Sequence, residues 1–130
     1  MIIDTSALVA ILRDEPERMA FADAIAQDPL PRKSAANYLE VGALVDGRRN
    51  PTLSRLVDSV IAEGDIAIEP VTARQALIAR AAYRDFGRGS GHPARLNFGD
   101  CFAYALAKDT GEELLFKGDD FIHTDIRPAL

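Results

Sequence analysis

The sequence lacks the features that define several protein classes. It has a single cysteine, Cys101, so it forms no intrachain disulfide and is typical of a reducing compartment. No apolar run approaches the roughly 20 residues that a membrane span needs, and we expect no contact with a membrane. The first residues also show no basic segment and no cleavage site of a secretory signal, which favours a cytoplasmic location.

An excess of basic charge is also absent. Fifteen basic and twenty acidic side chains give a net charge of −5, which disfavours a protein that wraps nucleic acid nonspecifically. Hydrophobic residues make up 48% of the chain and charged residues 27%, a globular balance that excludes a disordered chain. The length of 130 residues is usual for one domain, so we expect residues 1–130 to form a single domain.

Short aliphatic runs alternate with longer segments of helical spacing. The runs predict strands at residues 2–3, 66–68 and 114–116, and the spacing predicts helices at residues 6–13, 17–26, 34–47, 52–63, 72–85 and 98–109. Strands separated by helices favour a parallel sheet that is covered on both faces. The predicted fold is therefore α/β, a three-layer α/β/α domain with a central, mainly parallel sheet.

Residues of the expected capping types mark several helix ends. Ser34, Thr72 and Asn97 are predicted N-caps, and Gly111 is a predicted C-terminal stop. Residues 87–93 contain three glycines and a proline, which predicts a surface loop. This loop is not a dinucleotide-binding fingerprint, because it follows a helix rather than a strand.

Acidic residues follow two of the predicted strands. Asp4 ends the first strand, and Asp119 and Asp120 come shortly after the last one. In parallel sheets, ligand sites lie beyond the carboxyl ends of the strands, so these acids are candidates for one site. A helix cap is the alternative role for Asp4 or Ser6, and a solvated turn is the alternative for the two later aspartates.

Two further acids lie on predicted helices. Glu40 is in an apolar helix on the same face as Asn37 and Leu44, which points it toward packed structure. A salt bridge from Glu40 to one of the arginines that follow, Arg48 or Arg49, is the alternative. Asp100 is three residues after Asn97, so it either closes a capping box or binds a cation. Gly99 would allow another group to approach the chain closely next to Asp100, and Phe98 and Phe102 are expected to form a buried face.

These carboxylates come from four separate segments, and three of the segments should meet at one edge of the sheet. Like charges at close range need a cation, and an all-oxygen ligand set without histidine or cysteine selects Mg²⁺ or Mn²⁺ over Zn²⁺. Between Arg74 and Arg95 the chain has five arginines and only one acid, Asp85. Metal-bound acids beside a basic segment suit hydrolysis of phosphodiester bonds.

Four segments in order resemble the motifs of the PIN-domain ribonucleases, and more narrowly those of the VapC toxins of bacterial VapBC modules. They are residues 4–7, Glu40, residues 96–101 and residues 115–121. The resemblance spans the whole chain. It implies that Asp4 and Asp100 are the principal metal ligands, with Glu40 as a second acid. The fourth acid is either Asp119 or Asp120, while Ser6 and Asn97 line the site.

The family implies an Mg²⁺-dependent endoribonuclease, with Mn²⁺ as a substitute, that is the toxin of a type II toxin–antitoxin module. It also implies a homodimer, a cognate VapB-like antitoxin, and tRNA or another structured RNA as a candidate substrate. Arg80, Arg84 and Arg88 recur every four residues and are candidates for contact with the RNA backbone, a solvated helix face being the alternative.

The competing functions are a PIN-like RNA-binding module without catalysis and a metal-dependent phosphatase. A haloacid dehalogenase-like phosphatase needs a second acid two residues after Asp4, where Ser6 stands.

Overall fold

Four short parallel strands form the centre of the fold in the computed structural model, which describes all residues 1–130. They are β1 (Ile2–Ile3), β2 (Arg32–Ser34), β3 (Ala67–Glu69) and β4 (Leu114–Leu115), arranged in the order β3-β2-β1-β4. Ile2 lies beside Arg32 on one side and Leu114 on the other, so β1 is an interior strand. The acid that follows β1 is therefore placed near the middle of the sheet edge.

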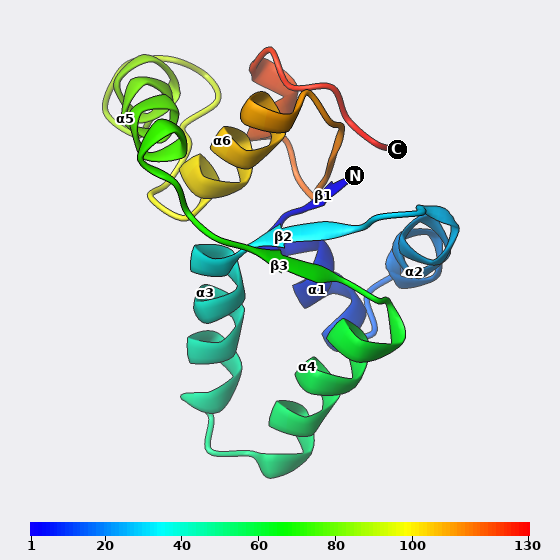
Figure 1. The fold of residues 1–130 in the computed structure, drawn as a ribbon. Coiled ribbons are helices and arrows are strands. Elements are labelled where there is room, and N and C mark those ends of the chain that lie inside the picture. The colour runs from blue at the N-terminus through cyan, green and yellow to red at the C-terminus, as the bar shows by residue number, and fades with distance from the viewer.

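Helices cover both faces of this sheet (Figure 1). They are α1 (Thr5–Leu12), α2 (Arg18–Gln27), α3 (Ala35–Asp46), α4 (Pro51–Glu63), α5 (Ala73–Phe86) and α6 (Asp100–Thr110), with a short 3₁₀ helix η1 (Phe121–His123) near the end. Each of the six predicted helices is present, and its ends lie within two residues of the predicted ones. The layered α/β fold is confirmed.

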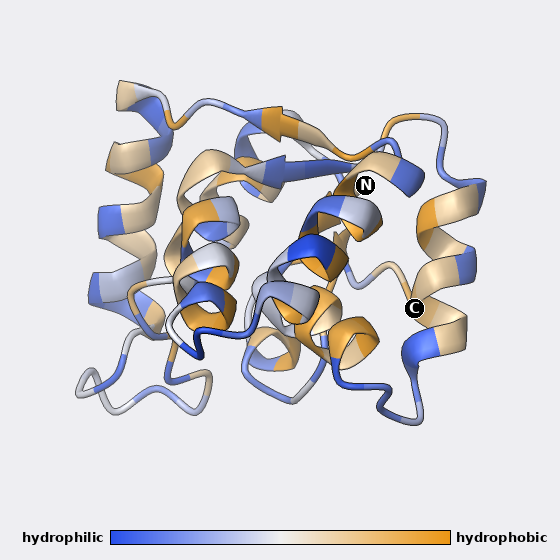
Figure 2. Cartoon of the chain, turned by 90° about the horizontal axis from the view of Figure 1, so that it is seen from below, coloured by the Kyte–Doolittle hydropathy of each residue, from blue (hydrophilic) through white to orange (hydrophobic).

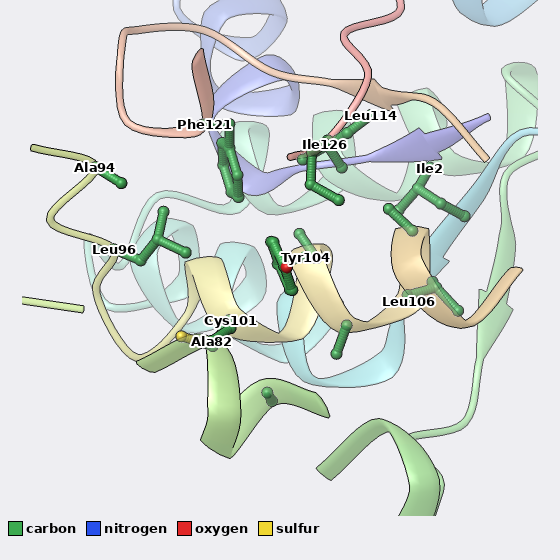
Figure 3. Packing of buried hydrophobic residues seen from close by; sticks show 14 residues of the cluster. Ile2, Ala82, Ala94, Leu96, Cys101, Tyr104, Leu106, Leu114, Phe121 and Ile126 are labelled. Carbon is green, nitrogen blue, oxygen red and sulfur yellow. The ribbon is translucent and has the colours of Figure 1, made fainter. Parts of the chain in front are cut away.

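The buried side chains form two layers because successive residues of a strand point to opposite faces. Ile2 and Leu114 pack with residues of α5 and α6, and Figure 3 shows Tyr104 of α6 among this set. Ile3 and Leu115 pack in the other cluster, with α1, α2, α3 and α4. Figure 2 shows hydrophobic residues concentrated on the inward sides of the helices. No helix has the length and apolar character that crossing a bilayer requires.

Strand β2 is absent from the prediction, which counted three strands. Its residues Arg32, Lys33 and Ser34 are polar, and hydrophobic patterning gives no strand signal for them. Lys33 and Ser34 are nevertheless buried, because β2 lies between β1 and β3 in the interior of the sheet. A lysine in this position has no access to bulk water and needs partners within the protein.

The capping predictions are largely confirmed. The Asp4 carboxylate caps α1 by accepting a hydrogen bond from the Ser6 amide, and the Thr72 hydroxyl accepts one from Gln75 at the start of α5. Gly111 ends α6 in the left-handed conformation. Ser34 occupies the N-cap position of α3, but its side chain makes no capping bond, and its buried hydroxyl has no partner.

Candidate active site

Asp4 lies at the carboxyl end of β1 and is 3% exposed. Its Oδ2 accepts hydrogen bonds from the Ser6 amide at 2.8 Å and the Ser6 hydroxyl at 2.6 Å. The same hydroxyl accepts a hydrogen bond at 2.9 Å from the amide of Lys117, which follows β4. Ser6, in the first turn of α1, therefore links Asp4 to the segment after β4 and fixes the orientation of the Asp4 carboxylate.

Glu40 reaches the same region from the second turn of α3. Its Oε2 accepts a hydrogen bond from the Thr5 hydroxyl at 2.6 Å and another from Asn37 Nδ2 at 3.1 Å. Asn37 Nδ2 also donates to the carbonyl of Gly99 at 2.9 Å. The Glu40 carboxylate lies against Gly99 so closely that a Cβ atom at residue 99 would collide with it. Glu40, Asn37 and Gly99 thus join α3 to the start of α6.

The turn that precedes α6 holds Asp100 in a reciprocal pair of hydrogen bonds. The Asn97 amide donates to Asp100 Oδ2 at 2.7 Å, and the Asp100 amide donates to Asn97 Oδ1 at 2.9 Å. This is the capping interaction that the sequence suggested for these two residues. It leaves the other carboxylate oxygen, Oδ1, without a hydrogen bond to the protein.

The acids act on one another electrostatically at Asp100. Burial raises the pKa of Asp100 to about 7, while the hydrogen bond from the Asn97 backbone lowers it. The negative charges of three other acids raise this pKa further, and these acids are Asp4, Asp120 and Glu40. Acids from all four predicted segments therefore meet electrostatically at Asp100, and the contact of Glu40 with Gly99 places α3 directly beside it.

Asp119 and Asp120 follow β4 and are both exposed. Asp120 precedes η1 and makes no side-chain capping bond there. Of the two, only Asp120 contributes to the pKa of Asp100. The choice of the fourth acid, which the sequence left open, stays between these two residues.

Lys33 is the residue of this region that the sequence did not reveal. Its side chain is fully buried, and its Nζ donates to the Ile3 carbonyl at 3.2 Å and lies 3.5 Å from the Thr5 hydroxyl oxygen. Burial lowers its pKa to about 8, and the nearby charges of Asp4 and Glu40 oppose this shift. Lys33 therefore places a cation beneath the acids. A prediction of β2 as an interior strand would have identified Lys33 as a buried residue.

Two sequence expectations about neighbouring residues are wrong. Phe98 is 76% exposed rather than buried, because the turn before α6 directs it outward, and its ring meets the ring of Phe102 edge-on. Leu44 is exposed as well, so the face shared with Glu40 is not wholly packed. The alternative salt bridge from Glu40 to Arg48 or Arg49 is not among the ion pairs, since Glu40 is turned toward Thr5 instead.

The arginines of α5 and the following loop fall into two groups. Arg84 pairs with Asp85 at 2.7 Å, and Arg74 pairs with Asp109 at 2.6 Å. The others are exposed and have no ion-pair partner, and these are Arg80, Arg88 and Arg95. The positive charge that is free to meet an anion is therefore concentrated toward the loop that leads to Asn97.

The donor set fits a hard divalent cation in its chemistry, although no three acidic, histidine or cysteine side chains are close enough together to form a ready-made metal cage. The donors near Asp100 are all carboxylate oxygens, which Mg²⁺ and Mn²⁺ prefer. Burial is the main cause of the raised pKa of Asp100, and the negative charges of Asp4, Asp120 and Glu40 add to it, which a bound cation would offset.

Comparison with known proteins finds a family match and relatives that span almost the whole chain. Residues 1–127 match the PIN domain family. Ribonuclease VapC28 of Mycobacterium tuberculosis is 59% identical over 130 residues, which cover 100% of this chain and 98% of that protein. Ribonuclease VapC42 of the same species is 55% identical over 129 residues, with 99% and 98% coverage.

Solved structures share the fold at low sequence identity. The crystal structure of Mycobacterium tuberculosis VapC20, described as a Sarcin-Ricin loop cleaving toxin, has a TM-score of 0.72 at 19% identity, and the alignment covers 98% of both chains. A chain of a toxin–antitoxin complex from Klebsiella pneumoniae has a TM-score of 0.67 at 18% identity, with 92% of this chain and 88% of that chain covered. The family match and the full-length identity, with the shared fold, show that the chain belongs to the VapC ribonucleases of the PIN domain family.

Proposed function

We propose that this VapC ribonuclease hydrolyses RNA phosphodiester bonds at a site where Asp4 and Asp100 hold Mg²⁺ or Mn²⁺. Glu40 and either Asp119 or Asp120 complete the shell directly or through water, since Mg²⁺ usually retains several water ligands. When bound, the ion would supply an activated water and stabilise negative charge on the phosphate oxygens. The observation that supports this proposal is the placement of Glu40 against Gly99, beside Asp100, where the charges of Asp4, Glu40 and Asp120 add to the rise in the pKa of Asp100 that burial causes.

The chain's own residues keep the acids in place before substrate arrives. Ser6 orients Asp4, and Thr5 and Asn37 orient Glu40. The Asn97 amide holds one oxygen of Asp100, so the other oxygen is free to bind. Such positioning lowers the cost of bringing reacting groups into line.

The test is cleavage of RNA with added Mg²⁺, with added Mn²⁺ and with a chelator. Asp4→Asn and Asp100→Asn should each abolish cleavage while the circular dichroism spectrum stays unchanged, because the Asn side-chain oxygen can still accept the hydrogen bonds that these carboxylates accept. Asp23→Asn, at an exposed acid of α2, is the matched control and should retain activity. Full activity in Asp4→Asn or Asp100→Asn, purified free of wild-type enzyme, would contradict the proposal.

We also propose that the protein is the toxin of a type II module and acts in the cytoplasm, with tRNA or another structured RNA as substrate. A small VapB-like antitoxin would cover the acids, since an inserted arginine can pair with carboxylates in a bidentate manner. Expression of the chain alone in its native host should arrest growth, and expression with the antitoxin should restore it. Normal growth with soluble wild-type protein would contradict the toxin role but not the nuclease chemistry.

The homodimer that the family implies is part of the same proposal. Several large apolar side chains are exposed, on α3 and α5 among other elements: Leu39, Leu44, Leu77 and Tyr83. Exposed apolar area of this kind suits a contact between subunits. Sedimentation should give twice the monomer mass, and a monomer at all concentrations would contradict the dimer.

A further inference from the structure

Phe98 has an unusual position for a large aromatic side chain. It is 76% exposed, although it lies only two residues before Asp100. Its ring meets Phe102 edge-on, with ring centroids 4.9 Å apart and planes at 87°. This contact favours one orientation of the Phe98 ring and leaves most of its surface open.

The turn that carries Phe98 is held on both sides. The two hydrogen bonds between Asn97 and Asp100 close the turn, at 2.7 and 2.9 Å. The carbonyl of Gly99, the next residue, accepts hydrogen bonds from Asn37 Nδ2 at 2.9 Å and from the Phe102 amide at 3.1 Å. An exposed ring on a turn that is bonded in this way has a defined place beside the acids.

Unpaired positive charge lies immediately before this turn. Arg88 and Arg95 are exposed, neither has an ion-pair partner, and Arg95 adopts a left-handed backbone conformation with φ of 51°. Backbone hydrogen bonds between Arg88 and Leu96 and between Leu96 and Phe86 close the base of the loop. Cations that follow a phosphate backbone, next to an aromatic ring, are the combination used to bind single-stranded nucleic acid.

We propose that Phe98 is a stacking platform for an unpaired nucleobase of the RNA, next to the phosphodiester bond that is cut. The inference rests on the ribonuclease function proposed above and adds a substrate-binding residue to it. The ring is flanked by polar Asn97 and by Gly99 and Asp100 rather than by apolar neighbours in the chain, which favours a base over a broad apolar protein surface. Stacking is tolerant of base identity, so Phe98 selects single-stranded RNA at this position rather than a sequence.

Fluorescence of 2-aminopurine gives the direct test. Short single-stranded oligoribonucleotides, each with one 2-aminopurine at a successive position, are bound to protein that carries Asp4→Asn to prevent cleavage. Stacking should quench the probe at one or two adjacent positions. Phe98→Ala should remove this quenching and weaken binding about 5- to 100-fold, whereas Phe98→Tyr and Phe98→Trp should preserve both.

Three controls separate stacking from other roles of the side chain. Phe98→Leu keeps an apolar group but has no aromatic face, and it should behave like Phe98→Ala. Ile122→Ala removes another exposed apolar side chain, which is 62% exposed, and should leave RNA binding unchanged. An abasic nucleotide at the quenched position should weaken binding by the protein with Phe98 but not by the Phe98→Ala protein.

Unchanged affinity and quenching in Phe98→Ala would overturn the proposal. So would a change from dimer to monomer in this variant, which would make Phe98 a contact between two copies of the chain. If the wild-type protein cleaves RNA and Phe98→Ala shows the same RNA affinity and the same quenching as the protein with Phe98, only the stacking role fails. If the wild-type protein cleaves no RNA with Mg²⁺ or Mn²⁺, the proposed function itself fails.

Discussion

Glu40 and Asp120 both act on Asp100 through their charge, but the chain holds them in different ways. Glu40 accepts hydrogen bonds from Thr5 and Asn37 and lies against Gly99, so its position is fixed. Asp120 is exposed and its side chain makes no capping bond. One side of the site is therefore built into the fold, and the other is free to adjust when a cation or substrate binds.

Of the two sides, the larger effect is expected from a change on the fixed side. Gly99→Ala places a Cβ atom against the Glu40 carboxylate and displaces it. Because small misplacements of catalytic groups reduce rates about 100-fold, RNA cleavage should fall by about that factor. Gly42→Ala in α3 is the control, since a Cβ there meets only Asp46 at 3.9 Å, and it should leave cleavage unchanged. Equal activity in the two variants would show that the Glu40–Gly99 contact has no part in the reaction.

Asn37→Ala should reduce both stability and activity. The change removes the Asn37 amide, which donates hydrogen bonds to Glu40 and to the Gly99 carbonyl. Loss of these bonds should cost about 1–3 kcal/mol of unfolding free energy. Asn50→Ala, which removes the cap of α4, should cost about 1 kcal/mol with no loss of cleavage. Urea unfolding and RNA cleavage of both variants check this, and a loss of stability alone in Asn37→Ala would argue against an orienting role.

A smaller effect is expected on the free side, and it should separate the two aspartates there. Asp120→Asn should reduce cleavage about tenfold, as for residues that support a metal site, because its charge acts on Asp100. Asp119→Asn should change cleavage by less than about twofold, because the charge of Asp119 does not contribute to the pKa of Asp100. Initial rates at several Mg²⁺ concentrations provide the measurement. The reverse order would assign the fourth acid to Asp119.

The pH dependence of stability measures how strongly both sides act on Asp100. Its pKa is raised from 3.8 to about 7, so between these values the folded metal-free protein binds more protons here than the unfolded chain does. This group therefore favours folding at low pH, and its contribution is lost as pH rises toward 7. As the pH rises between these two values, the unfolding free energy of the metal-free wild type should fall relative to that of Asp100→Asn. Parallel pH curves for the two proteins would contradict the raised pKa.

The smallest effect concerns the arginines outside both sides of the site. Replacement of Arg80, Arg84 and Arg88 by Gln should weaken binding of unrelated RNAs and lower the salt slope by roughly 0.7 per lost phosphate contact. Arg84 should contribute least, because it is already paired with Asp85. Binding titrations at several salt concentrations check this. Unchanged affinity and slope would make these residues a solvated helix face.

The sequence predicted the parts of this structure that depend on local signals. Asp4 and Thr72 cap helices as their positions indicate, because a cap is set by residue type and spacing. The fixed side of the site was only partly predictable. The Asn37–Glu40 bond joins two residues that helical spacing already placed on one face, but the Thr5–Glu40 bond depends on how α3 packs against α1, which no local pattern encodes.

Strand β2 and Phe98 show why the rest was missed. Lys33 is polar and yet buried, because its neighbours in the sheet rather than its own hydropathy decide its environment. Phe98 was expected to pack inside and instead faces outward, because the turn closed by Asn97 and Asp100 fixes its direction. A helical spacing rule does not apply to a residue that precedes the helix.

The central claim is that Asp4 and Asp100 together hold a divalent cation, and metal binding tests it most directly. Mn²⁺ binding can be counted by electron paramagnetic resonance of the free ion, without any RNA present. The wild-type protein should bind Mn²⁺, and Asp4→Asn and Asp100→Asn should each lose this binding while Asp23→Asn retains it. Equal Mn²⁺ binding in the wild type and in both site variants would contradict the account.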